Sequence, residues 1–184
     1  MLKSLAINAA VLVMVMIGIA GSVGAQDEMP PLGPPPQMAE LDFLLGEWEV
    51  AMEWRYDDTS AWQESKAVVT YKHILGGAAI LTEFSSIMMG MPFEGIGIQT
   101  WDRENNEWQM TWTDNMGART GIYTGQVDDG KMVLTGEDKY QGQTMMSRIT
   151  SYDLSEAKFQ WSMENSMDGG KTWVLTGRAT YVRK

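Results

Sequence analysis

The sequence predicts an all-β protein, an up-and-down antiparallel barrel of about ten strands with a short N-terminal helix. Three observations lead to this class. Apolar and polar residues alternate in successive runs from Gly46 onward, which is the period of a half-buried strand. Clusters of turn-forming residues separate these runs. No helical segment interrupts them, and closing such a meander into a barrel removes its exposed edges.

Residues 1–25 are predicted to be a secretory signal peptide. Lys3 gives a basic start, residues 5–20 are apolar except for Asn8, and Ala25 closes a Val-x-Ala cleavage pattern. The apolar run falls short of the roughly 20 residues of a spanning helix. We therefore expect cleavage rather than an uncleaved anchor, no stable membrane insertion afterwards, and export to the periplasm or the extracellular space.

The composition excludes several function classes. The chain has no cysteine, so disulfides, thiol catalysis and lipid anchoring through a cysteine are excluded. Removing Lys3 from the 14 basic residues leaves 13 against 24 acidic ones, a net charge of −11. Such a surface repels phosphate backbones, so no nucleic-acid partner is expected.

Two elements are expected before the first strand. Residues 26–37 carry five of the six prolines and should form an extended, poorly packed leader. From Gln37 to Leu45, the positions of Met38, Leu41, Leu44 and Leu45 predict a short helix of about two turns, which Gly46 ends. A single barrel domain is expected over residues 38–184.

The strand pattern separates an interior face from a wet face. The interior face should carry alternate residues of three runs: Trp48, Val50, Met52, Trp54 and Tyr56; Trp108, Met110 and Trp112; Phe159, Trp161 and Met163. Nine turns are expected between the strands, at Asp57–Ser60, Gly76–Gly77, Met91–Pro92, Asn105–Asn106, Asn115–Gly117, Asp129–Gly130, Gln141–Gly142, Ser155–Glu156 and Asp168–Gly170.

The start of the first strand, Gly46-Glu47-Trp48 after a short helix, resembles the Gly-x-Trp signature of the calycins: lipocalins, fatty-acid-binding proteins and nitrobindin-like barrels. In those relatives the tryptophan plugs one end of the barrel, often against an arginine of the last strand. The resemblance therefore implies structural roles for Gly46 and Trp48. By strand parity Arg183 is the candidate partner, with Arg178 in reserve.

A second resemblance is to a bacterial family of uncharacterised exported proteins with lipocalin-like barrels. It rests on five features: Gly95-Ile96-Gly97, Trp101-Asp102, Trp112-x-Asp114, the hairpin from Gly125 to Gly130, and the hairpin Asp168–Trp173. It covers about residues 38–184. It implies the fold and no agreed activity.

The segment Ser166-x-Asp168-x-Gly170-x-Thr172-Trp173 matches the Asp-box of sialidases. A sialidase needs several such boxes, an arginine triad and a tyrosine nucleophile, whereas this chain has one box. We interpret it as a hairpin clip, in which Asp168 accepts backbone N–H groups, Gly170 supplies a positive φ and Trp173 covers the base.

No cofactor or metal is expected. His73 is the only histidine, on the parity of Val69 and Tyr71. Nitrobindin-like barrels hold heme through a histidine late in the chain, and no histidine follows His73. A lone histidine without cysteine is a poor metal site, so His73 should be a hydrogen-bonded strand residue.

The only residues of the sequence that would support a catalytic function are acidic side chains on the strands. One histidine gives no basis for a Ser-His-Asp arrangement. Glu83, on the parity of Leu81, and Asp114 could face inward, and Glu164 also lies in a strand; Arg119 or Arg148 could pair with such acids. An internal ion pair or an exposed acid explains these residues without an activity, so the protein is not expected to be an enzyme.

The methionines of the predicted barrel fit either packing of the core and loops or a pocket for an apolar molecule, and of the two overall functions we favour ligand binding. Three of the sixteen methionines lie in residues 1–25, which leaves thirteen, and methionine suits adaptable apolar surfaces. We expect a small lipophilic molecule in the barrel, with alternatives of a barrel packed solid by its own side chains, acting in structure or protein interaction, and of an enzyme of unknown reaction. The candidate ligand-binding residues are Trp54, Trp108, Met110, Trp112, Asp114, Tyr123, Arg148 and Trp161.

Overall fold

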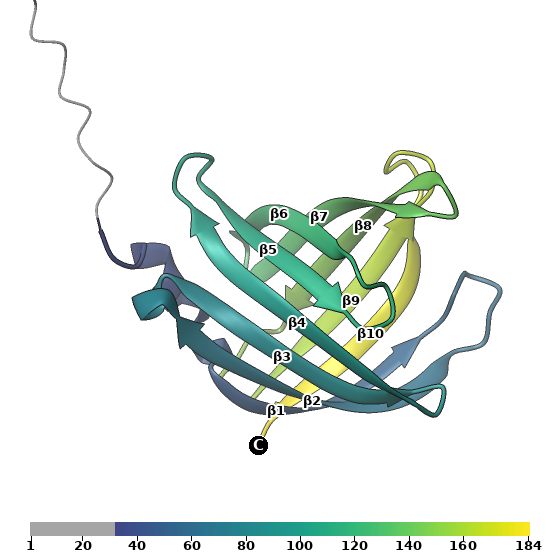
Figure 1. Ribbon diagram of the computed structural model, residues 1–184, viewed down its shortest axis with the longest axis horizontal. Helices are drawn as coiled ribbons and strands as arrows, with labels where there is room; N and C mark the ends of the chain where they lie inside the picture. The colour runs from purple at the N-terminus through teal and green to yellow at the C-terminus, as the bar shows by residue number, and fades with distance from the viewer. Residues whose placement is uncertain (1–31) are drawn as a thin grey trace, which may run out of the picture. The chain divides into compact units, whose positions relative to one another are not determined.

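The computed structural model describes residues 32–184, so the predicted signal peptide and the leader up to residue 31 lie outside the described residues. Ten antiparallel strands form a closed barrel in which each strand pairs with its neighbour in the sequence and β1 pairs with β10 (Figure 1). The predicted all-β meander, closed into a ten-strand barrel, is thereby confirmed. No helix among these residues is long and apolar enough to cross a membrane.

The strands are linked by short connections. Their bounds are β1 Gly46–Trp54, β2 Gln63–Ile74, β3 Ala79–Met88, β4 Met91–Asp102, β5 Glu107–Asp114, β6 Thr120–Asp128, β7 Lys131–Tyr140, β8 Gln143–Tyr152, β9 Lys158–Ser166 and β10 Val174–Arg183. Two 3₁₀ segments are present, η1 Pro36–Leu44 and η2 Leu75–Gly77.

One predicted turn is wrong. Met91 and Pro92 begin β4, and the turn before them is Met89–Gly90. Both residues of that turn have positive φ, 52° and 76°, as the tight turns of two-residue hairpins require. Pro92 is tolerated because it stands at the beginning of the strand.

The N-terminal helix is a 3₁₀ helix, so the expected two turns of ordinary helix are corrected. Its buried residues are Met38, Leu41 and Leu44, all at most 6% exposed. They recur every three residues, the repeat of a 3₁₀ helix, so that all three fall on one face. Pro35 just before it is also buried, and Arg103 donates to the carbonyl of Gly33 at 2.6 Å. Part of the predicted leader therefore packs against the barrel.

The η1 segment covers one end of the barrel, the closed end, where β1 begins and β10 finishes (Figure 1). Trp48 is fully buried there, its Nε1 donates to the carbonyl of Leu44 at 2.6 Å, and its ring meets Phe159 edge-on at 5.0 Å. The guanidinium of Arg183 lies over the Trp48 ring, 4.5 Å from its centroid.

Arg183 also donates to the carbonyls of Phe43, Leu45 and Glu156. The last strand is thereby fixed to η1 and to the loop before β9. Arg178, the reserve candidate, instead faces outward and binds both carboxylate oxygens of Glu53, at 2.7 and 2.9 Å.

Candidate functional site

The barrel contains a cavity of about 600 Å³. Its wall extends from the η1 side chains Leu41 and Leu44 at the closed end to Met116 and Tyr140, near the opposite end. Because Met116 and Tyr140 are 57% and 50% exposed, the cavity reaches the surface at that opposite, open end.

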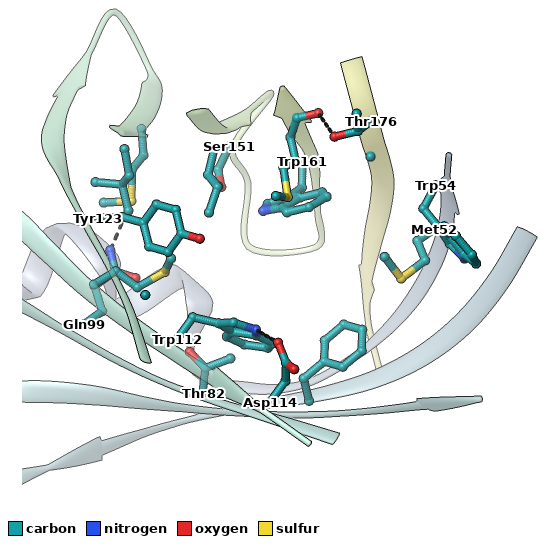
Figure 2. A pocket seen from close by; sticks show the side chains of 18 of the residues that line it. Met52, Trp54, Thr82, Gln99, Trp112, Asp114, Tyr123, Ser151, Trp161 and Thr176 are labelled. Atoms are coloured by element: carbon teal, nitrogen blue, oxygen red, sulfur yellow. Dashed lines mark hydrogen bonds between the residues drawn. The ribbon is translucent and has the colours of Figure 1, made fainter. Parts of the chain in front are cut away.

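Six of the predicted ligand-binding residues line this cavity. They come from four strands: Trp54, Met110, Trp112, Asp114, Tyr123 and Trp161. All of these except Met110 are labelled in Figure 2, among the side chains that line the cavity. Trp108 is fully buried and meets Trp101 edge-on at 5.4 Å, and it is not part of the cavity wall. It contributes to the core instead.

Arg148 does not face the interior, and this prediction is corrected. Its neighbours Ser147 and Ile149 belong to the buried side of β8, with Ser147 1% exposed and Ile149 in the cavity wall. Side chains alternate along a strand, so Arg148 lies outside. There it pairs with Glu164 at 2.8 Å and stacks on Trp173, 4.2 Å from the ring centroid.

Glycines explain why the large rings leave a cavity. A Cβ added to Gly95 would lie 2.2 Å from Cζ2 of Trp112, and one added to Gly97 would lie 3.4 Å from Cε3. Atoms from two sides of the six-membered ring of the indole therefore lie over Gly95 and Gly97, which are successive inward residues of β4. The ring is held against the wall instead of extending across the barrel.

Tyr123 and Trp161 are seated in the same way. A Cβ on Gly136 would lie 2.7 Å from Cδ1 of Tyr123, and one on Gly121 would lie 3.0 Å from Cε2, on the other edge of the ring. A Cβ on Gly177 would lie 3.0 Å from Cζ3 of Trp161. The alternation of glycines such as Gly95 and Gly97 with outward residues is the sequence signal of this seating.

Charged groups of the cavity wall gather near the open end. The carboxylate of Asp114 accepts from Nε1 of Trp112 at 3.0 Å and from the backbone N–H groups of Met116 and Gly117, at 3.0 and 2.6 Å. Arg119 pairs with Asp138 and donates to the Lys139 carbonyl. Asp138 was not predicted as a site residue.

Deeper in the cavity the polar groups are neutral. Burial raises the pKa of Tyr123, and the nearby carboxylate of Asp138 raises it further. Burial also raises the pKa of Tyr71 and of Tyr181, two cavity residues joined by a hydrogen bond. These phenols therefore stay protonated at neutral pH.

Two buried polar groups face the cavity with unused hydrogen-bonding capacity. Gln99 is 5% exposed, and its Nε2 donates to the Met132 sulfur at 3.1 Å. Within residues 32–184, its amide oxygen and the hydroxyl of Tyr123, which is 8% exposed, have no hydrogen-bond partner. Gln99 was not predicted as a site residue, because a glutamine on a strand is expected to face solvent unless the strand register places it inside.

The other chemistry candidates lie outside the cavity. Glu83 faces solvent and pairs with Lys72, so its predicted inward orientation is wrong: Ile80 and Phe84, at 0% and 9% exposure, set the inward parity of β3. His73 lies at the closed end, where its Nε2 is 3.1 Å from the carboxylate of Asp42.

The Asp-box forms a clip at the β9–β10 hairpin. Asp168 accepts from the backbone N–H groups of Lys171 and Thr172, at 3.0 and 2.9 Å, and from the Thr172 hydroxyl at 2.7 Å. These bonds, with the backbone bond from Thr172 the largest cause, hold its pKa well below the usual range. Gly170 has a φ of 85°, and Trp173 Nε1 donates to its carbonyl at 2.9 Å.

A closed antiparallel barrel with a plugged end and an internal cavity is the calycin-like arrangement that the sequence predicted. The chain belongs to a protein family of unknown function, DUF1579, whose pattern matches residues 34–183. This confirms the predicted resemblance to an uncharacterised family. No curated protein matches the chain.

Solved structures of similar fold have low sequence identity. Rv2717c from M. tuberculosis is 14% identical, with a TM-score of 0.58 over 82% of this chain and 99% of that one. The S-type phycobiliprotein lyase CPES from Guillardia theta is 12% identical, with a TM-score of 0.52 over 79% of this chain and 91% of that one. At these identities the likeness shows the fold alone.

Proposed function

We propose that this protein binds a small apolar or amphipathic molecule inside the barrel. The observation that carries the proposal is the cavity of about 600 Å³ that reaches the surface at the open end. Small-molecule sites are typically concave, apolar and of about 300–1,000 Å³. The alternative of a barrel packed solid by its own side chains does not account for this volume.

The distribution of charge supports an amphipathic ligand. Asp114, Arg119 and Asp138 belong to the wall near the open end, whereas Leu134, Phe159 and the neutral phenols line the deeper part. A molecule with its apolar part inward and a polar group at the open end matches this order. The carboxylate of Asp114 already accepts three hydrogen bonds, which suits a positioning role better than proton transfer.

We also propose that the mature protein is exported, on the strength of the signal-peptide pattern in residues 1–25. The full chain would be expressed in a bacterial host and the periplasmic fraction analysed by mass spectrometry. A mature N-terminus at Gln26 is expected. Retention of the intact chain in the membrane fraction would refute export by cleavage.

Native mass spectrometry of residues 26–184, purified gently, tests the binding function. A reproducible added mass that organic solvent removes is expected. Ser151→Phe fills the cavity from an inward position of β8 and should abolish the added mass, whereas Thr150→Phe, its outward neighbour, should retain it. Equal loss or equal retention in both variants would contradict binding in the cavity.

A further inference from the structure

We infer that the ligand is a planar aromatic molecule bearing a hydroxyl or amino group, held between the indole rings of Trp112 and Trp161. This inference rests on the proposed function and narrows its ligand class. Its first basis is the seating of the rings. Because Trp112 lies against Gly95 and Gly97 on one side, the face that remains for a ligand is the one toward the cavity.

The second basis is the placement of the two indoles around the barrel. Trp112 belongs to β5 and Trp161 to β9, four strands away in a closed barrel of ten. Figure 2 shows them on opposite sides of the cavity, with Tyr123 to one side. Aromatic rings on opposite walls offer contacts to both faces of a flat ligand, and stacked or edge-to-face aromatic contacts add to the affinity that burial alone provides.

The third basis is the pair of unused polar groups. Gln99 and Tyr123 are register neighbours of Met110, from β4 on one side and β6 on the other. The Gln99 oxygen can only accept a hydrogen bond, and the Tyr123 hydroxyl can donate or accept. A ligand O–H or N–H group can donate to Gln99, and a saturated hydrocarbon would leave both groups unsatisfied at a cost.

The experiment compares four probes by tryptophan fluorescence and calorimetry on residues 26–184. The probes are 1-hydroxypyrene, which is planar with a hydroxyl; pyrene, which lacks the hydroxyl; 5α-androstan-3β-ol, a saturated four-ring alcohol; and laurate. We expect 1-hydroxypyrene to bind at least tenfold more tightly than androstanol or laurate. Pyrene should bind about fivefold more weakly than 1-hydroxypyrene, which is the effect of one hydrogen bond.

Variants connect the preference to the proposed groups. Trp161→Leu keeps an apolar side chain without the aromatic face and should weaken 1-hydroxypyrene about fivefold while changing laurate by less than twofold. Trp173→Leu is the matched control, because Trp173 stacks on Arg148 outside the barrel, and it should change neither. Gln99→Leu should remove the preference for 1-hydroxypyrene over pyrene.

The outcomes separate the two proposals. Binding of androstanol or laurate as tightly as 1-hydroxypyrene would overturn the planar-ligand inference and leave a binding cavity in place. Equal weakening of all probes by Trp161→Leu would overturn it as well, because a general packing change would then explain the loss. Failure of all four probes to bind would refute the proposed function together with the inference.

Discussion

Gly95→Ala tests whether glycines create the cavity by holding aromatic rings against the wall. The new methyl group would lie 2.2, 2.6 and 3.0 Å from three atoms of the Trp112 ring, whereas ordinary contact begins at 3.4 Å. The nearest ring atom must therefore move by 3.4 − 2.2 = 1.2 Å. That displacement also strains the 3.0 Å hydrogen bond from Trp112 to Asp114.

The magnitude follows from three contributions. Overpacking of this kind costs about 1–3 kcal/mol, and loss of a hydrogen bond costs about 1 kcal/mol. Replacing glycine by alanine raises the free energy of unfolding by about 0.4–1 kcal/mol, because alanine restricts the conformations of the unfolded chain. We expect the free energy of unfolding to fall by about 1–3.5 kcal/mol, measured by urea denaturation with circular dichroism as the probe.

Gly97→Ala is the matched control. It is the next inward glycine of β4, and its new methyl group would meet Trp112, Thr82 and the Thr111 carbonyl at 3.2–3.4 Å, so the change should stay within about 1 kcal/mol. In a Trp112→Leu background the obstructing ring is gone, and Gly95→Ala should cost at least about 1 kcal/mol less than in the native background. Equal costs at Gly95 and Gly97, or additive effects with Trp112→Leu, would refute the reasoning.

Two further predictions concern the closed end and a surface turn. Arg183→Met removes the guanidinium that donates hydrogen bonds to the carbonyls of Phe43, Leu45 and Glu156 and that lies over the ring of Trp48. The free energy of unfolding, measured by thermal and urea denaturation, should fall by about 2–4 kcal/mol. Arg178→Met, which breaks an exposed ion pair, should change much less, and equal losses would argue against the plug. Hydrogen bonds from Ser60 and Thr59 lower the pKa of Asp57 to about 2, so its stabilisation is complete above the ordinary pKa near 3.8 and is lost as the pH falls toward 2. The stability difference between the native protein and Asp57→Ala should therefore shrink between pH 5 and 2, and a difference constant over that range would contradict this linkage.

The inward-facing residues of a strand could be predicted from the alternation of the sequence wherever only one face of the strand is apolar. It assigned the inward residues of β1, β5 and β9, because Trp48, Met110 and Trp161 alternate with polar neighbours. It failed for Glu83 and Arg148, whose strands carry apolar residues on the outer face too. Leu81 pairs across the outer surface with Ile98, so sharing its parity did not indicate an inward position for Glu83.

The same ambiguity explains Arg148. Its outward neighbour Met146 lies beneath the β9–β10 hairpin, where its sulfur would be 3.4 Å from a Cβ on Gly170. An apolar residue buried by a loop on the outside follows the same alternation as one buried by the barrel on the inside. Only the pairing of β8 with β7 and β9 distinguishes the two.

The barrel divides stability and binding between its two ends. At the closed end, Trp48, Arg183 and η1 join the first and last strands through buried rings and hydrogen bonds to backbone carbonyls. Closure of the strands into a barrel already pairs the backbone hydrogen-bonding groups around the cavity, so the interior beyond the closed end need not be filled for the fold to persist.

The cavity nevertheless lacks the van der Waals contacts between apolar groups that a filled core would supply. Glycines that seat aromatic rings against the wall reduce this loss, because each ring keeps van der Waals contact with the backbone while its other face stays available to a ligand. A protein without a ligand gains nothing from that arrangement, since larger side chains at Gly95, Gly136 and Gly177, with the rings directed inward, would pack the same barrel more fully.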